Sequence, residues 1–160
     1  MTLSPYRSLH DRFARLGAIR EALGILHWDS ATNMPEGAAP SRGEQLATLK
    51  VIVHEGLTDS ALPDLLAGAE GQNDLDTWQR ANLAEMRRGI AHATAVPGDL
   101  VAAFSRACSE CEMAWRKARP AADFAAVLPA LSRVLSLTRE VAAAKAAALG
   151  KSPYEALLDE

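Results

Sequence analysis

Apolar residues recur at steps of three and four along most of this chain, the spacing of one face of an α-helix. The clearest case is residues 99–149, where two such runs are separated by the break Arg119-Pro120-Ala121-Ala122. We interpret the two runs as an antiparallel hairpin of amphipathic helices, and we expect both apolar stripes to be buried. The stripes are Val101, Phe104, Cys108, Cys111 and Trp115, then Val127, Leu131, Val134, Thr138, Val141 and Ala148.

The first helix is predicted to begin at Ser4-Pro5, because serine is a good N-cap and proline suits the first helical position. Its apolar stripe continues to about Trp28. Gly17 and Gly24 lie beside this stripe and weaken the helix. We therefore expect another backbone to approach closely along the glycine edge.

Three further helices are predicted before the hairpin. Residues 32–40 form an irregular loop, and the second helix begins after it at the capping-box sequence Ser41-Arg42-Gly43-Glu44 and ends near Gly56. A short third helix covers about residues 59–67. A fourth follows the polar segment 68–74 and carries an apolar stripe from Leu75 to Ile90.

The hairpin and the end of the chain carry clear start and stop signals. Pro97 opens the first arm, Asp123 caps a turn, and the main part of the second arm is predicted to start at Pro129. Gly150 ends that arm, and Ser152-Pro153-Tyr154-Glu155 opens a last helix with a capping box. So few residues follow this start that we expect the chain to be a fragment of a longer protein.

Composition agrees with a helical protein. The chain has 160 residues, of which 49% are hydrophobic and only 5% aromatic, and many are alanine. Close-packed helices suit this composition better than strands, which favour β-branched and aromatic residues. We predict an all-α bundle of about six to seven helices, forming a single helical region over residues 1–160.

The charge excludes two classes of partner. The formal net charge is −3, without the clusters of Lys and Arg that nucleic acid or an anionic membrane surface would require. No apolar run reaches the roughly 20 residues of a membrane span, and the first residues do not resemble a signal peptide. We therefore expect a cytoplasmic protein that binds neither nucleic acid nor membrane.

The residues that could bind a metal do not have metal-site spacing. His54-Glu55-Gly56-Leu57-Thr58 begins like the zinc-protease motif H-E-x-x-H, but Thr58 occupies the second ligand position. Cys108 and Cys111 lie inside a helical pattern and are interpreted as small core residues. We predict no catalytic and no metal-binding residue in this chain. No two histidines are four residues apart among His10, His27, His54 and His92.

One polar cluster has two interpretations. His27, Trp28 and Asp29 end the first predicted helix and lead through Met34-Pro35 toward Arg42. These residues either line a substrate groove or form a capped and packed helix end. Sequence spacing leaves both interpretations open.

Three segments of this chain resemble the N-terminal part of the carboxypeptidase Taq family of thermostable metallocarboxypeptidases. They are His27-Trp28-Asp29-Ser30-Ala31-Thr32-Asn33-Met34-Pro35 with Arg42, Trp115 to Pro120 running into Asp123-Phe124 and Pro129-Ala130-Leu131, and Ser152 to Asp159. Their order and spacing match across essentially the whole chain. Where the family usually has Tyr-Asp, this chain has Tyr154-Glu155.

The resemblance implies an all-helical enzyme about three times as long, whose catalytic half carries H-E-x-x-H and binds a divalent metal, zinc or cobalt. Such enzymes remove C-terminal residues from peptides, and the family is similar to other homodimeric peptidases. The present chain would form one wall of the substrate groove and be inactive alone. The alternative is a stand-alone helical interaction module that binds a partner through its apolar face.

Overall fold

The computed structural model describes residues 4–159, and within them it contains seven α-helices and one 3₁₀ turn but no strand. The predicted all-α fold is therefore confirmed. None of the described helices is both long and apolar enough to span a membrane. The helices are α1 (Pro5–Thr32), α2 (Ala39–Leu57), α3 (Leu62–Glu70), α4 (Thr77–Thr94), α5 (Gly98–Ala118), α6 (Phe124–Leu149) and α7 (Pro153–Leu158), with the 3₁₀ turn at Glu36–Ala38.

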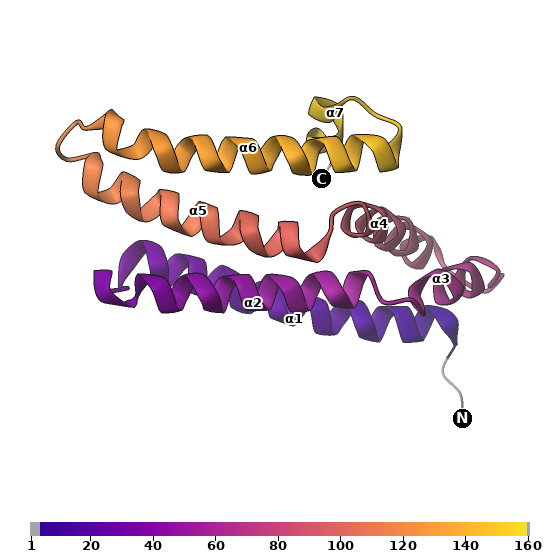
Figure 1. Ribbon diagram of the computed structural model, residues 1–160. Helices are drawn as coiled ribbons and strands as arrows, with labels where there is room; N and C mark the ends of the chain where they lie inside the picture. Colours follow the sequence, from indigo (N-terminus) through magenta and orange to yellow (C-terminus); the bar gives the residue numbers. More distant parts are fainter. Residues whose placement is uncertain (1–3, 160) are drawn as a thin grey trace.

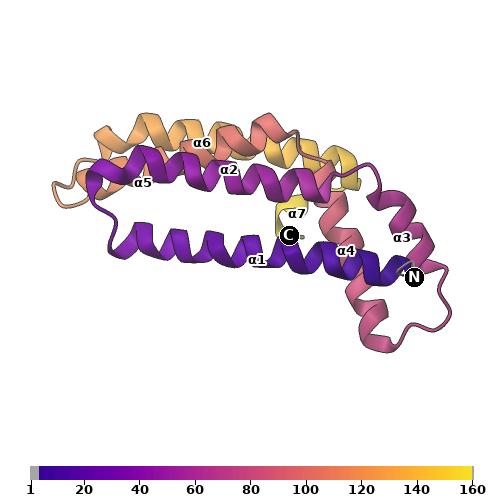
Figure 2. The same ribbon diagram turned by 90° about the horizontal axis from the view of Figure 1, so that it is seen from below.

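The long helices are stacked in order across the molecule. Helix α2 packs on α1, α5 packs on α2, and α6 packs on the other side of α5 (Figure 1). Helices α3 and α4 lie at the end of the stack where α1 begins, and α7 folds back on α6 (Figures 1 and 2). The predicted hairpin of residues 99–149 is present as α5 and α6.

Several helix boundaries follow from local caps. The Ser4 hydroxyl accepts a hydrogen bond from the Arg7 amide, and the Asp123 carboxylate accepts one from the Ala126 amide. Ser152 and Glu155 form a reciprocal capping box at the start of α7. Gly150 ends α6 in the left-handed conformation, with φ of 64°. These starts and this stop agree with the prediction.

Three predicted helix starts are wrong. Helix α2 begins at Ala39 rather than Ser41, because the 3₁₀ turn before it runs directly into the helix, and no side chain caps this end. Pro129 lies inside α6, since the Asp123 cap already starts that helix at Phe124. Helix α3 also begins later than expected, after a turn in which the Asp59 carboxylate accepts a hydrogen bond from the Ala61 amide.

Two hydrophobic clusters hold the first four helices together. One joins the start of α1 to α3 and α4, and its centre is Leu9 and Leu62, which are almost completely buried. The other joins the middle of α1 to α2 through Leu16, Leu23 and Leu46. Phe13 packs against both clusters and makes them continuous along α1.

The predicted burial of the hairpin stripes is only partly correct, because most of the stripe residues are half-buried rather than buried. On α5 the buried residues are Ser105, Ala107 and Ala118, whereas Trp115 of the stripe is 44% exposed. Small residues are buried there because α2 approaches closely: a Cβ on Gly43 would lie 3.7 Å from the Ser109 Cβ. On α6 the stripe residue Val127 is buried, but Leu131 and Ala148 are exposed.

The expected close approach beside Gly17 and Gly24 is also wrong. A Cβ built on either glycine would have no neighbour within 4 Å. The close approach occurs instead at Gly56, where a Cβ would lie 2.6 Å from Leu16 Cδ2.

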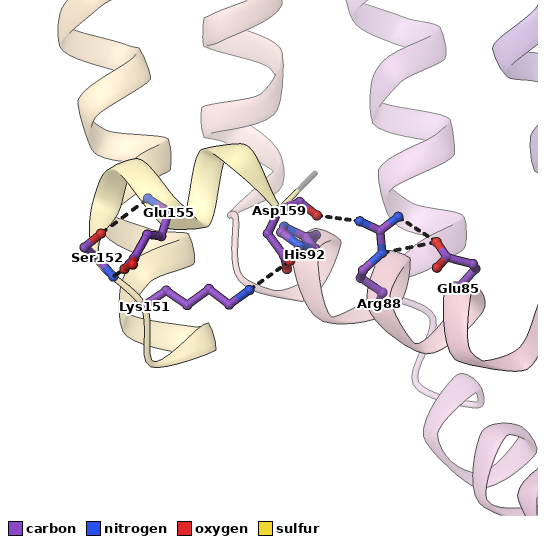
Figure 3. Close-up of polar contacts among 7 residues, drawn as sticks. All are labelled: Glu85, Arg88, His92, Lys151, Ser152, Glu155 and Asp159. Carbon is purple, nitrogen blue, oxygen red and sulfur yellow. Dashed lines mark hydrogen bonds and ion pairs between the residues drawn. The ribbon is translucent and has the colours of Figure 1, made fainter. Parts of the chain in front are cut away.

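Helix α7 is held on α4 by a cluster of charged groups (Figure 3). The Asp159 carboxylate lies 3.0 Å from His92 Nε2 and 2.8 Å from Lys151 Nζ, and the Asp159 carbonyl accepts a hydrogen bond from Arg88. Lys151 lowers the pKa of the Asp159 carboxyl most, and His92 lowers it further. The last helix is thus fixed to a helix far away in the sequence.

Candidate functional site

The predicted cluster at the end of α1 is centred on Asp29 and Arg42. The Arg42 side chain extends from α2 to α1, where its Nη1 lies 2.6 Å from Asp29 Oδ2. The same nitrogen donates to the Leu26 carbonyl at 3.0 Å and to the Ser30 hydroxyl oxygen at 3.3 Å. Arg42 is only 17% exposed, so one partly buried guanidinium joins the two helices.

A third helix joins the same point. Arg116 of α5 donates a hydrogen bond to the Ser30 carbonyl and also pairs with Glu112 on its own helix. Ser30 is buried, and its hydroxyl donates to the Leu26 carbonyl at 2.8 Å. The end of α1 is therefore held by one arginine from α2 and one from α5. Arg116 was not among the predicted site residues, because nothing in its spacing along the sequence links it to Ser30.

The other two predicted residues, His27 and Trp28, lie apart from this pair. Trp28 is 61% exposed, although its backbone carbonyl accepts a hydrogen bond from the Thr32 hydroxyl. Burial lowers the pKa of His27, the nearby Lys50 ammonium lowers it further, and Glu112 opposes the shift. Among residues 4–159, neither side chain forms a hydrogen bond or ion pair with Asp29 or Arg42. The structure therefore joins two of the four residues and leaves an indole exposed beside them.

The structure also contains a cavity that the sequence did not predict. It has a volume of about 880 Å³, opens to solvent, and is lined by residues of α1, α2, α4, α5 and α6. We call it the central cavity. Its size is in the range of pockets that hold small organic ligands. Lys50 and Ser105 are among the residues that line it. The sequence did not predict the cavity, because the space between five helices depends on distances that no local sequence pattern contains.

A second hollow runs between the two arms of the hairpin. This α5–α6 groove has a volume of about 490 Å³ and an almost wholly apolar lining, made of Cys108, Cys111, Glu112, Trp115, Phe124, Val127, Leu131 and Val134. The two cysteines are free thiols, and burial raises the pKa of Cys108. Both are half-buried at the groove surface rather than in the core, so their predicted interpretation as core residues is wrong.

Within the part of the chain that the structure describes, no group of three or more His, Cys, Asp or Glu side chains is placed to hold a metal ion. His54 lies in the last turn of α2 against Gly98, where a Cβ would be 3.6 Å from its Nε2. The described residues therefore do not fit a divalent metal centre.

Comparison with known proteins identifies the family. A family model described as carboxypeptidase Taq (M32) metallopeptidase matches residues 8–160. The chain belongs to this family. The resemblance of the three sequence segments to carboxypeptidase Taq enzymes is thereby confirmed.

The sequences of individual M32 family members match this chain along nearly its whole length. Thermostable carboxypeptidase 1 of Thermus thermophilus is 34% identical over 154 residues, covering 92% of this chain and 30% of that protein. Thermostable carboxypeptidase 1 of Pyrococcus furiosus is 30% identical over 148 residues, covering 92% of this chain and 29% of that protein. The chain thus spans about 30% of the length of these curated relatives, as expected for the N-terminal portion of such a protein.

A solved M32 structure has the same arrangement of helices. Trypanosoma cruzi metallocarboxypeptidase 1 matches with a TM-score of 0.76 and 34% sequence identity. The match covers 99% of this chain and 32% of that chain. The helical stack described above therefore corresponds to about one third of the fold of that protein.

Proposed function

We propose that this chain is the N-terminal helical region of a metal-dependent carboxypeptidase that removes C-terminal residues from peptides. The observation that carries the proposal is the M32 family match over residues 8–160, together with relatives that are named carboxypeptidases. In this proposal residues 1–160 form one helical region, and the catalytic half lies in the remaining two thirds of the enzyme. The enzyme acts on peptides in the cytoplasm.

The divalent metal of the proposed enzyme, zinc or cobalt, is held outside this chain. The family description names a metallopeptidase, and the described residues do not supply a ligand set. Peptide hydrolysis requires an activated water and a stabilised oxyanion, and we assign both to the catalytic half. The 160-residue chain alone is therefore inactive in this proposal.

The role of the chain is to support one wall of the substrate groove at the end of α1. Arg42 and Arg116 fix this end against α2 and α5, which leaves the exposed Trp28 ring available for a peptide side chain. His27, Asp29 and Arg42 complete the proposed wall, Asp29 and Arg42 by holding the backbone that carries Trp28. Positioning of this kind affects turnover without contacting the metal.

The test compares three proteins in a peptide-trimming assay read by mass spectrometry. The proteins are the 160-residue chain, the Thermus thermophilus relative, and a chimera in which this chain replaces the matched 30% of that relative. We expect trimming by the last two, abolished by a chelator, and none by the chain alone. Trimming by the repurified 160-residue chain that survives a chelator would overturn the proposal.

The proposed role of Trp28 in the wall of the substrate groove can be tested with a matched control substitution. In the active chimera, Trp28→Ala is expected to lower kcat/KM several-fold with the metal content unchanged. Trp78→Ala removes a tryptophan that is 84% exposed at the start of α4, and it is expected to leave kcat/KM unchanged. Equal effects of the two substitutions would mean that Trp28 does not border the groove.

We also propose that the enzyme is a homodimer. The exposed apolar face along the α5–α6 groove supports this proposal, and it also supports a second candidate function. Large apolar side chains are exposed along and beside the α5–α6 groove, including Phe124 at 63% and Leu135 at 48%. A face of this kind marks an association surface. It would serve either the dimer or a stand-alone helical module that binds a partner.

Two measurements separate these candidates. Reading the coding sequence beyond codon 160 shows whether the frame continues into H-E-x-x-H, which the enzyme requires and the module does not. Light scattering of the 160-residue chain should show a dimer that Leu131→Glu converts to monomer. A monomer at all concentrations would contradict the dimer.

A further inference from the structure

The central cavity has a positive lining in an acidic protein. Four cationic side chains line it, whereas Glu85 is the one carboxylate among the described lining residues. The whole chain, in contrast, has 20 acidic and 17 basic residues. Glu85 is already paired with Arg88 at 2.6 Å. The cationic residues of the lining are Arg20, Lys50, Arg88 and Lys145.

Lys50 lies in this lining without a counter-charge among the described residues. It lies on α2, is half-buried, and has no hydrogen bond or ion pair with any residue in the range 4–159. Burial lowers its pKa, and its electrostatic neighbours are His27 of α1 and Cys108 of α5 rather than a carboxylate. A half-buried ammonium without an anion is costly, and a bound anion would remove that cost.

Ser105 provides a second, independent sign of a ligand. It lies on α5, the helix that packs on α2, and is only 2% exposed. Its hydroxyl oxygen is buried and has no hydrogen-bond partner among the described residues. Buried hydroxyl groups are normally paired, because an unpaired one loses its bonds to water without replacement. Ser105 lines the same cavity as Lys50.

The rest of the lining is apolar and defines the other part of the ligand. Phe13, Leu23, Val53, Met86 and Phe104 all face the cavity, and they come from four different helices. A bare inorganic anion would satisfy Lys50 but leave these walls unoccupied. An anion with a hydrocarbon body matches both parts of the lining.

We propose that the central cavity binds a small organic carboxylate with an apolar body. Lys50 supplies the positive charge, Ser105 donates a hydrogen bond, and the apolar side chains cover the hydrocarbon part. This site is separate from the wall at the end of α1 and does not depend on the proposed peptidase function. A carboxylate of this chemistry comes either from a fatty acid or from the C-terminal residue of a peptide.

The test is a calorimetric titration of the 160-residue chain with two carboxylates and their neutral amides. Octanoate represents the fatty acid, and N-acetylphenylalanine represents the C-terminal residue. We expect saturable binding of at least one carboxylate, with a Kd of roughly 1 mM or tighter, and at least about ten-fold weaker binding of octanamide or N-acetylphenylalaninamide. The tighter of the two carboxylates identifies the source.

Variants locate the binding in the cavity. Lys50→Met is expected to weaken carboxylate binding about ten-fold or more, and Ser105→Ala by a few-fold, because a charged and a neutral hydrogen bond are lost. Lys50→Arg keeps the charge and should retain most of the affinity. Lys117→Met removes an exposed lysine on α5 that lies 3.8 Å from Glu36, and should change nothing.

Three results would overturn the proposal. They are the absence of saturable binding by the wild-type chain, equal binding of the neutral amides, and equal losses in Lys50→Met and Lys117→Met. Phosphate is titrated in parallel, and tighter binding of phosphate than of either carboxylate would also contradict the assigned ligand class. Circular dichroism confirms that each variant is folded before it is titrated.

Discussion

Arg42 Nη1 lies 2.6 Å from Asp29 Oδ2 and at the same time donates to the Leu26 carbonyl, so one guanidinium nitrogen from α2 contacts both a carboxylate and a backbone carbonyl of α1. Both side chains are partly shielded from water. An ion pair in such a position is stronger than an exposed one, because solvent screens it less. The pair therefore has a structural role whether or not it also borders a groove.

Removing this guanidinium should destabilise the fold. Arg42→Met leaves the partly buried Asp29 carboxylate without its cation and removes the hydrogen bonds that Arg42 donates to the Leu26 carbonyl and the Ser30 hydroxyl, and we expect a loss of about 2 kcal/mol in the free energy of unfolding. Urea denaturation of the variant and the wild type measures this loss. The control is Arg106→Met, which breaks the exposed pair with Glu44 at 2.7 Å and should cost less than about 1 kcal/mol. Similar losses in both variants would contradict the distinction.

The glycines of α1 and α2 should respond oppositely to alanine. Gly24→Ala places a Cβ in open space within a helix, so we expect a gain approaching about 1 kcal/mol in unfolding free energy. Gly56→Ala places a Cβ 2.6 Å from the buried Leu16 Cδ2, and the displaced core should outweigh that gain, giving a net loss of about 1 kcal/mol. Thermal unfolding followed by circular dichroism decides, and a stabilised Gly56→Ala variant would be inconsistent with the observed packing.

The docking of α7 against α4 should weaken at low pH. Lys151 and His92 hold the pKa of Asp159 below its ordinary value of 3.8, so the ionised carboxylate favours the docked state. The contribution is fully present above pH 3.8 and is lost as the pH falls through the lower folded-state pKa. NMR spectra of the α7 amides recorded across this acid range should show the helix loosening. In Asp159→Asn, α7 should be loosened already at neutral pH and should show no such acid transition.

Lys50 should reduce the stability of the empty protein. Its pKa is lowered by burial, so the folded state disfavours the charged form. The cost is present at neutral pH and decreases as the pH rises toward the ordinary lysine value of 10.5. Lys50→Met should therefore raise the midpoint of thermal unfolding at pH 7, and the difference from wild type should become smaller at alkaline pH. An unchanged or lower midpoint at pH 7 would contradict this account.

Helices and their caps were predictable because they depend on residues near one another in sequence. Ser4, Asp123 and Ser152 act as caps in the structure as predicted, since each bonds to an amide three residues later. The Ser41 capping box did not form, because the preceding turn had already started the helix. A cap pattern therefore indicates a helix but does not exclude an earlier start.

The buried face of α5 was not predictable from periodicity. A helix between two neighbours, α2 and α6, is contacted on two sides, and small residues such as Ser105 and Ala107 are buried where helices approach closely. The larger Trp115 remains at the edge of a groove instead. For the same reason the central cavity was missed, since its lining comes from five helices whose distances no local pattern contains.

The contacts between α4 and the end of α7 close a long loop of the chain, and this loop contains the α5–α6 hairpin. His92 and Asp159 are 67 residues apart in sequence, and both arms of the α5–α6 hairpin lie between them. A helix of six residues does not form stably alone, so α7 depends on its packing against α6 and on these contacts with α4. Bringing such distant residues together costs loop entropy unless the intervening helices are already ordered. We therefore expect α7 to become ordered after the hairpin during folding, so that its amides would report whether the whole chain has completed its assembly.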